Sequence, residues 1–310
     1  MSEVRVGTCS WSDKNLLSSG WYPPQARDAA SRLKFYARHF DTVEIDSSFY
    51  AIPSEPVLYQ WVSRTPPDFI FNIKSFGLFT HHAVSPKVLP VKFQEDTAGK
   101  RIRLQDLTKE QRRTLWDIFY ERVMILHRMG RLGYLLFQFP STFVYSKAGL
   151  EYIRRLAVLC RPIKAAVEIR HNSWMETSAK EKLLELLREE NMAYVVVDEP
   201  KLLWTVPFEP HVTATWAVVL RFHGRNSAAW MKKGVSVAER FAYRYDLAEL
   251  RAFAEEAVRL AGSSERVYVM FNNCYRDYAV KNALQMKGLL GLGRELSSGE
   301  QKALDLDESL

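Results

Sequence analysis

The stretch "FDTVEIDSSFY" (residues 40–50) has the pattern of a β-strand with acidic residues on one face, and the rest of the chain is interpreted from this pattern. Val43 and Ile45 alternate with Glu44 and Asp46, and side chains two residues apart lie on the same face of a β-strand. This strand therefore has one apolar face and one face with two carboxylates. Because an unpaired buried carboxylate is costly, we expect cations from other strands to face Glu44 and Asp46.

Seven further segments have the apolar, β-branched and aromatic composition of buried strands. Helical patterns with apolar residues three and four positions apart separate most of them, for example in residues 109–129 and 247–261. The alternation predicts parallel βαβ units, and eight such units predict an α/β fold of the TIM type, a closed parallel (β/α)8 barrel. The eight predicted strands are 4–11, 42–49, 69–76, 133–140, 165–171, 193–200, 216–224 and 267–274.

Two connections depart from this pattern. Residues 80–107 form a long polar insertion with prolines after the third strand. Residues 200–215 contain three prolines and no helical period, so we expect the connection between strands six and seven to be irregular and its helix missing or vestigial. Since no linker or repeat divides the chain, we expect a single barrel domain, 1–295, followed by a polar C-terminal tail, 296–310.

The composition is typical of a globular protein, with 47% hydrophobic and 25% charged residues among 310. Lys and Arg outnumber Asp and Glu by 43 to 36, a balance that is compatible with nucleic acid, an anionic metabolite or no charged partner. Three well-separated cysteines indicate reduced thiols rather than a disulfide framework. No apolar run approaches the roughly 18 residues of a membrane span. We therefore expect a cytoplasmic protein without a membrane partner.

Polar residues gather where the predicted strands end. In a (β/α)8 barrel, inward side chains at these ends form the functional mouth. A period of two, applied to each strand, places four carboxylates and three cations at this level, which predicts a hydrogen-bonded ion network. The inward polar residues are Glu44, Asp46, Asn72, Lys74, Gln138, Glu168, Arg170, Asp198, Arg221, His223 and either Asn272 or Asn273.

Such a network is suited to acid–base chemistry, because neighbouring ionisable groups push one another's pKa values apart. We assign this chemistry to Glu44, Glu168, Asp198 and His223. Lys74 is expected to orient an anion or, if it is desolvated, to form a Schiff base. No metal or other cofactor is predicted, because three cations already balance the acids and His223 is the one histidine on the inward phase.

The last two loops, "FHGRNSAAW" (222–230) and "FNNCYRDYAVKNAL" (271–284), lie where many barrels bind phosphate. Gly224 permits a close backbone approach, and Arg225 and Arg276 can make bidentate contacts to phosphate. The residues thus favour an enzyme for a small anionic ligand, phosphorylated or sugar-like. A nucleic-acid-binding barrel or phosphodiesterase is one alternative, and a non-catalytic barrel with a structural interior ion network is another.

Eight motifs follow one another along the chain: "VGTCSW", "TVEIDSSFYAIPS", "FIFNIKSF", "LLFQFPSTF", "VEIRHNSW", "VVVDEP", "LRFHGRN" and "VYVMFNNCY". Together and in this order they resemble the YecE-like family, domain of unknown function 72. The resemblance covers residue 4 to about residue 290 and implies a TIM-type barrel, in agreement with the strand pattern, but it implies no reaction. Relatives often have Asn where Asp46 stands, which makes Asp46 a poor choice for an obligatory acid.

Overall fold

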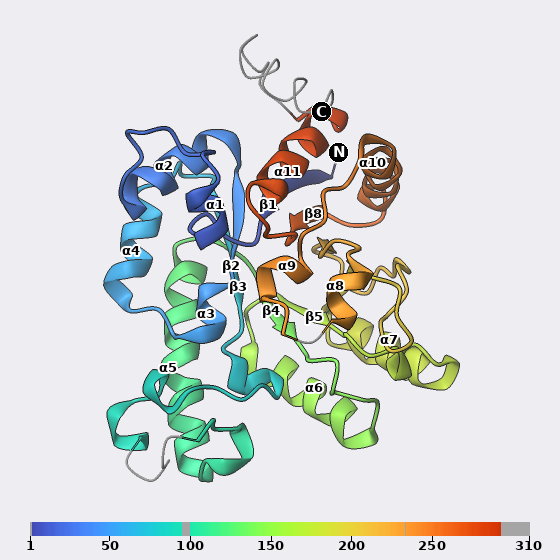
Figure 1. Ribbon diagram of the computed structural model, residues 1–310. Coiled ribbons are helices and arrows are strands. Elements are labelled where there is room, and N and C mark those ends of the chain that lie inside the picture. Colours follow the sequence, from blue (N-terminus) through green and yellow to red (C-terminus); the bar gives the residue numbers. More distant parts are fainter. Residues whose placement is uncertain (1, 95–99, 233, 293–310) are drawn as a thin grey trace.

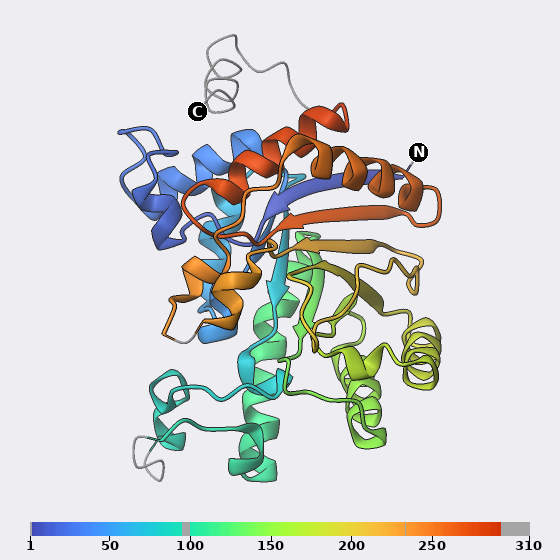
Figure 2. The same ribbon diagram turned by 45° about the vertical axis from the view of Figure 1, so that its right-hand side comes forward.

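The computed structural model describes residues 2–94, 100–232 and 234–292. Eight parallel strands form one sheet in the order β1-β8-β7-β6-β5-β4-β3-β2, which curls into a nearly closed barrel (Figures 1 and 2). The TIM-type fold predicted from the strand pattern is therefore confirmed. The strands are β1 (Glu3–Thr8), β2 (Thr42–Ile45), β3 (Ile70–Lys74), β4 (Leu132–Gln138), β5 (Ala165–Glu168), β6 (Ala193–Asp198), β7 (Val218–Phe222) and β8 (Arg266–Phe271).

Helices surround the sheet and bury their apolar faces against its outer side (Figure 1). In α10, for example, Leu250, Phe253 and Ala257 are buried, and the side chain of Asp246 caps the first turn. The helices are α1 (Lys14–Ser18), α2 (Ala29–His39), α3 (Ser47–Tyr50), α4 (Glu55–Ser63), α5 (Lys109–Arg128), α6 (Lys147–Cys160), α7 (Thr177–Glu189), α8 (Ser227–Met231), α9 (Val237–Arg240), α10 (Leu247–Ala261) and α11 (Tyr278–Leu289).

Both irregular connections are found where they were predicted. Residues 199–217, all within the described part of the chain, contain no helix between β6 and β7. The insertion after β3 contains the short 3-10 helices η1 (Gly77–Thr80), η2 (Pro86–Val88), η3 (Val91–Phe93) and η4 (Leu104–Asp106), and an antiparallel bridge joins Val84 to Ile102. Its apolar residues Leu89 and Phe93 are buried, so the insertion packs on the barrel. The predicted tail, 296–310, lies outside the described residues.

The barrel closes at a seam between β1 and β2, which are in contact but are not joined by a backbone ladder. The hydroxyl of Tyr36 accepts a hydrogen bond from the amide of Thr8 at 2.9 Å and donates one to the carbonyl of Thr42 at 3.1 Å. A Cβ atom on Gly7 would lie 2.4 Å from the same Thr42 oxygen, so only glycine permits this approach. The Tyr36 side chain thus replaces a rung of the missing ladder.

No helix in the described part of the chain is both long and apolar enough to cross a membrane.

Candidate functional site

The strand register determines which side chains point into the barrel. Gln138 lies beside Glu168 in the pairing of β4 with β5, and Glu44 lies beside Asn72 in the pairing of β2 with β3. On β7, Arg221 lies beside Val197 of β6. The inward positions at the carboxyl ends of the strands are therefore mostly those predicted from the period of two.

Asp198 is the exception, because the prediction that it points inward is wrong. Val197 takes the inward phase, so Asp198 faces the helix layer, where it accepts hydrogen bonds from Arg225 (2.7 Å) and from the hydroxyl of Tyr245 (2.6 Å). All six residues of β6 are buried. A strand that is buried on both faces shows no alternation, so the sequence does not reveal its phase. The next residue, Glu199, supplies the inward acid instead.

Arg221 lies at the centre of the interior network, between Glu44 and Glu168, and all three side chains are 0% exposed. The Nη2 atom of Arg221 donates to Oε1 of Glu44 at 2.5 Å, and its Nη1 atom donates to Oε2 of Glu168. The hydroxyl of Tyr134 donates to the other Glu44 oxygen at 2.9 Å. The predicted ion network therefore exists, with one guanidinium between two buried carboxylates.

Arg170 and His223 extend the network on the other side of Glu168. Nη1 of Arg170 and Nε2 of His223 each lie 3.1 Å from Oε1 of Glu168. Nε of Arg170 donates to Glu199 at 2.9 Å, and Nδ2 of Asn272 lies 2.9 Å from Nδ1 of His223. These contacts bring together, around one carboxylate, residues at or just beyond the carboxyl ends of β5, β6, β7 and β8.

Asn272 is thus the inward member of the asparagine pair. Asn273 faces away from the interior, and its amide donates to the carbonyl of Tyr243 and to Asn282 of α11, both at 2.9 Å. It therefore holds α11 and the loop before α10 in place and has no contact with the network.

The loop after β7, which contains α8 and α9, lies in front of the barrel strands in the view of Figure 1 and contacts this part of the network. The indole of Trp230 in α8 lies 5.3 Å from the guanidinium of Arg170, and the ring of Phe241, just after α9, lies 5.9 Å from the ring of His223. These contacts keep water away from Arg170 and His223, and they strengthen the electrostatic interactions beneath.

The interior groups occupy different protonation states near neutral pH. Burial opposes the ionisation of Glu168, but Arg221 and the other cationic neighbours outweigh it and hold the pKa of Glu168 well below its usual range. Burial raises the pKa of Glu44 to about 7, although Arg221 opposes this shift; the charge of Asp46 and a hydrogen bond to its carboxyl add to it. Burial, together with Arg170, lowers the pKa of His223 to about 3, so its ring is neutral.

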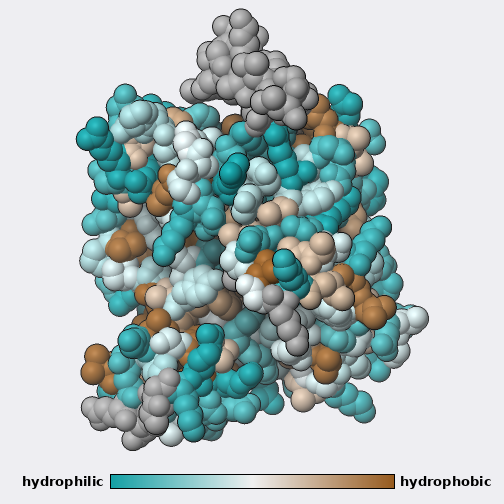
Figure 3. Space-filling model, viewed as in Figure 1, coloured by the Kyte–Doolittle hydropathy of each residue, from teal (hydrophilic) through white to brown (hydrophobic). Residues whose placement is uncertain are grey.

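Three polar side chains form an outer layer at the mouth, at the ends of the neighbouring strands β2, β3 and β4. Nζ of Lys74 lies 3.5 Å from Oδ1 of Asp46, and the two side chains are 12% and 23% exposed. Oδ1 of Asp46 and Oε1 of Gln138 are buried and receive no hydrogen bond from the part of the chain that the structure describes. Asp46, Lys74 and Gln138 are called the mouth triad below. The face shown in Figure 3 is hollowed between the segments labelled α3 and α9 in Figure 1.

The predicted phosphate corner is arranged differently from the expectation. Gly224 has the positive φ of 84° that favours glycine. Arg225, however, is held by Asp198 and by Glu249 at 2.7 Å, so two carboxylates surround its one positive charge. Arg276 is exposed at the surface. Arg225 therefore has no free charge with which to attract a phosphate.

Sequence reasoning missed several members of the site, among them Tyr134, Glu199 and Tyr245. Tyr134 stands four residues before Gln138 and so has the same inward phase, which the period of two applied to β4 would have revealed. Tyr245 lies just before α10 and Glu249 lies in its first turn. Both contact the Asp198–Arg225 pair, and no strand pattern predicts either residue.

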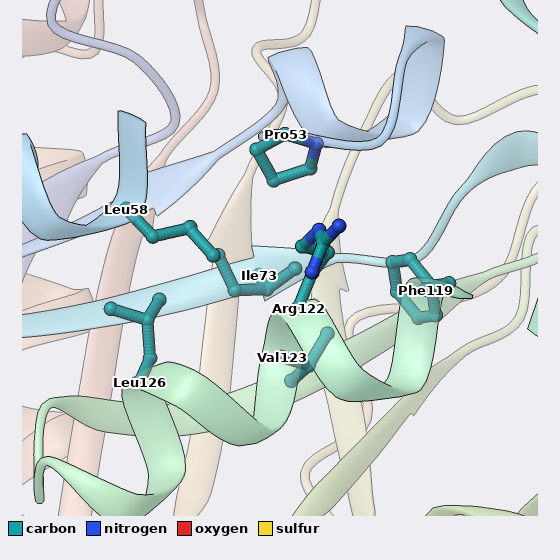
Figure 4. A pocket seen from close by; sticks show the side chains of 7 residues that line it. All are labelled: Pro53, Leu58, Ile73, Phe119, Arg122, Val123 and Leu126. Carbon is teal, nitrogen blue, oxygen red and sulfur yellow. The ribbon is translucent and has the colours of Figure 1, made fainter. Parts of the chain in front are cut away.

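Among the described residues, no group of three or more His, Cys, Asp and Glu side chains is placed to hold a metal ion. A separate shallow depression, too small to hold a water molecule, lies between α4, β3 and α5 (Figure 4). It is lined mainly by apolar side chains, including Leu58, Ile73 and Phe119, and contains none of the predicted site residues.

Comparisons with known proteins agree with the fold and the motifs. Residues 5–304 match the family described as protein of unknown function DUF72. The UPF0759 protein YunF of Bacillus subtilis (strain 168) is 30% identical over 307 residues, which cover 98% of this chain and 99% of that protein. The crystal structure of a DUF72 family protein from Enterococcus faecalis V583 has a TM-score of 0.77 and 27% identity, covering 94% of this chain and 97% of the other. The corresponding structure from Thermotoga maritima MSB8 has a TM-score of 0.74 and 34% identity, covering 93% and 99%. The chain therefore belongs to the DUF72 family, as its eight ordered motifs suggested.

Proposed function

We propose that this protein is an enzyme that moves a proton to or from a small polar ligand at the carboxyl-terminal mouth of the barrel. Glu44 is the group that changes protonation state, and Glu168 remains an anion that Arg221 and Arg170 hold in place. One observation carries this proposal: a mouth triad with acceptors that receive no hydrogen bond lies at the strand ends beside a buried ion network.

The different protonation behaviour of Glu44 and Glu168 supports acid–base catalysis. With a pKa of about 7, Glu44 can both give and accept a proton near neutral pH, whereas Glu168 stays ionised. Glu44 itself is 0% exposed, but Asp46, which is 23% exposed, is near enough for its charge to raise the pKa of Glu44, and Arg221 contacts both carboxylates. The Asp46 carboxyl therefore connects Glu44 with a ligand bound at the mouth.

Proton transfer can be tested without knowledge of the natural substrate. The protein is incubated in D2O with mixtures of small metabolites, and mass spectrometry records deuterium incorporation or product formation. We expect turnover by the wild type, a loss of at least about a hundredfold in Glu44→Gln because a general acid–base group is removed, and wild-type turnover in Glu121→Gln, which changes an exposed glutamate of α5. Equal turnover in Glu44→Gln and the wild type, or no turnover by either, would contradict the proposal.

A structural role for the network is the second candidate, and one observation favours it. Both carboxylate oxygens of Glu44 and of Glu168 already have partners within the protein. If the network only fills the barrel, Glu44→Gln will change stability and leave every catalytic or binding readout unchanged.

A further inference from the structure

We infer that the mouth binds an uncharged ligand rich in hydroxyl groups, of the sugar or polyol class. Asp46 and Gln138 accept hydrogen bonds from its hydroxyls, and Lys74 donates one to a ligand oxygen. This inference rests on the proposed function for the place of the ligand, and it adds the chemical class, which the network by itself leaves open.

The acceptor atoms of the mouth triad that receive no hydrogen bond determine which groups the ligand must carry. Oε1 of Gln138 receives no hydrogen bond within the described residues, and Oδ1 of Asp46 has ion-pair contacts to Lys74 at 3.5 Å and to Arg221 at 3.8 Å but no hydrogen bond; a buried acceptor that receives no hydrogen bond is costly. A hydroxyl group donates one hydrogen bond and accepts others, so a set of adjacent hydroxyls can satisfy both acceptors and also receive a bond from Lys74. The dianionic phosphate group of a monoester offers acceptors only, so that group itself cannot donate to Asp46 or to Oε1 of Gln138.

The charge around the mouth defines the second requirement. The inward charged groups at the mouth are four carboxylates and three cations, and Arg221 is one of the three cations. When Glu44 is ionised the carboxylates outnumber the cations by one, and when Glu44 holds its proton the two are equal; His223 is neutral because burial lowers its pKa to about 3. The full set is Glu44, Asp46, Glu168 and Glu199 against Lys74, Arg170 and Arg221.

An anionic ligand would therefore meet a site without surplus positive charge. Lys74 is the cation closest to the exposed part of the mouth, and it already faces Asp46 at 3.5 Å. Arg225, which the sequence suggested as a phosphate ligand, is bound by two carboxylates. A neutral ligand avoids the repulsion that a phosphate dianion would experience from Asp46.

An exposed aromatic ring at the rim provides a surface for the apolar face of a sugar. Tyr50 at the end of α3 is 64% exposed. Its ring lies 5.1 Å from that of Phe49, which in turn lies 4.9 Å from Nζ of Lys74. The C–H face of a sugar ring packs well on such an aromatic side chain while its hydroxyls reach the mouth triad.

Ligand-detected NMR and calorimetric titration test the class directly. The probes are neutral pentoses, hexoses and linear polyols, their monophosphates, and inorganic phosphate. We expect the intact protein to bind at least one neutral sugar or polyol more tightly than its monophosphate, and not to bind inorganic phosphate. Gln138→Leu should weaken that binding by about three- to tenfold, which corresponds to the loss of one hydrogen bond, and Gln60→Leu, an exposed position on α4, should not change it.

Lys74→Gln supplies a second test in case Gln138→Leu does not fold, and thermal unfolding of each variant verifies its fold. Tighter binding of phosphorylated probes, unchanged affinity in both mouth variants, or no binding of any neutral probe would overturn the inference. The two proposals can fail separately. If a neutral sugar binds at the mouth triad but no proton is exchanged, the proposed function fails and the ligand class stands; if proton exchange occurs only with phosphorylated ligands, the reverse holds.

Discussion

Replacement of Arg221 by methionine removes the one cation, among the residues that the structure describes, that contacts both Glu44 and Glu168, and it keeps a side chain of similar length. Removal of one partner from a buried ion pair typically costs about 3–5 kcal/mol, because the remaining charge is left without compensation. With an unfolding entropy of about 2.1 cal/mol/K per residue, 310 residues give roughly 0.65 kcal/mol/K, so Tm should fall by roughly 5–8 °C. Arg170 and His223 still contact Glu168, so we expect the protein to fold.

The pH dependence of the stability loss in Arg221→Met distinguishes an uncompensated charge from a simple packing defect. Arg221 lowers the pKa of Glu44, so its removal favours the protonated form. A neutral Glu44 needs no counter-ion, and the Arg221→Met variant should therefore be destabilised less at pH 5.5 than at pH 8.5. Differential scanning fluorimetry at both pH values measures this, with Arg154→Met as the control, an exposed arginine whose salt bridges contribute about 0–1 kcal/mol. A loss in Arg221→Met no larger than in the control, or equal at both pH values, would refute the reasoning.

Further predictions concern the seam and the network. Tyr36→Phe removes the partner of the Thr8 amide and the Thr42 carbonyl, so it should cost about 1–3 kcal/mol in a denaturant titration; a cost no greater than that of Tyr120→Phe, which loses one exposed hydrogen bond, would contradict the role of the seam. Glu44 keeps its proton up to about pH 7 in the folded protein but only to about 4.5 when unfolded, so this group's contribution to stability declines as pH rises through that interval. Glutamine cannot ionise, so the Tm of Glu44→Gln relative to the wild type should increase from pH 5 to pH 8, and a constant difference would show that the folded pKa is not raised.

The sequence was sufficient to predict the barrel because each of its layers leaves a pattern. Strands buried against helices are short and apolar, and the helices between them have apolar residues three and four apart, so the order of elements followed from periodicity. The alternation in β2 also predicted that Glu44 and Asp46 face inward, and the structure places Arg221 against both and Lys74 against Asp46. Inward charge at a strand end is conspicuous because its neighbours on the outer phase are apolar.

The parts that could not be predicted depend on contacts between distant residues. In β6 every position is buried, so the choice between Asp198 and Glu199 was decided by the pairing with β7, which the sequence does not show. The charge of Arg225 is paired with Glu249 of α10, which lies 24 residues further along the chain, so no local pattern reveals the pair. The seam bond of Tyr36 joins α2 to two strands and leaves no local pattern.

The most direct test of the central claim is a titration of the glutamate carboxyl carbons by NMR, on protein labelled with 13C at the side-chain carboxyl of glutamate. We predict one carboxyl with a midpoint of about 7 that is absent from Glu44→Gln, and a lower midpoint in Asp46→Asn because the charge of Asp46 raises the pKa of Glu44. The surface variant Asp117→Asn should leave that midpoint unchanged. If every glutamate carboxyl instead titrates near its ordinary value of about 4.3, Glu44 carries no proton at neutral pH and the acid–base account of the mouth is wrong.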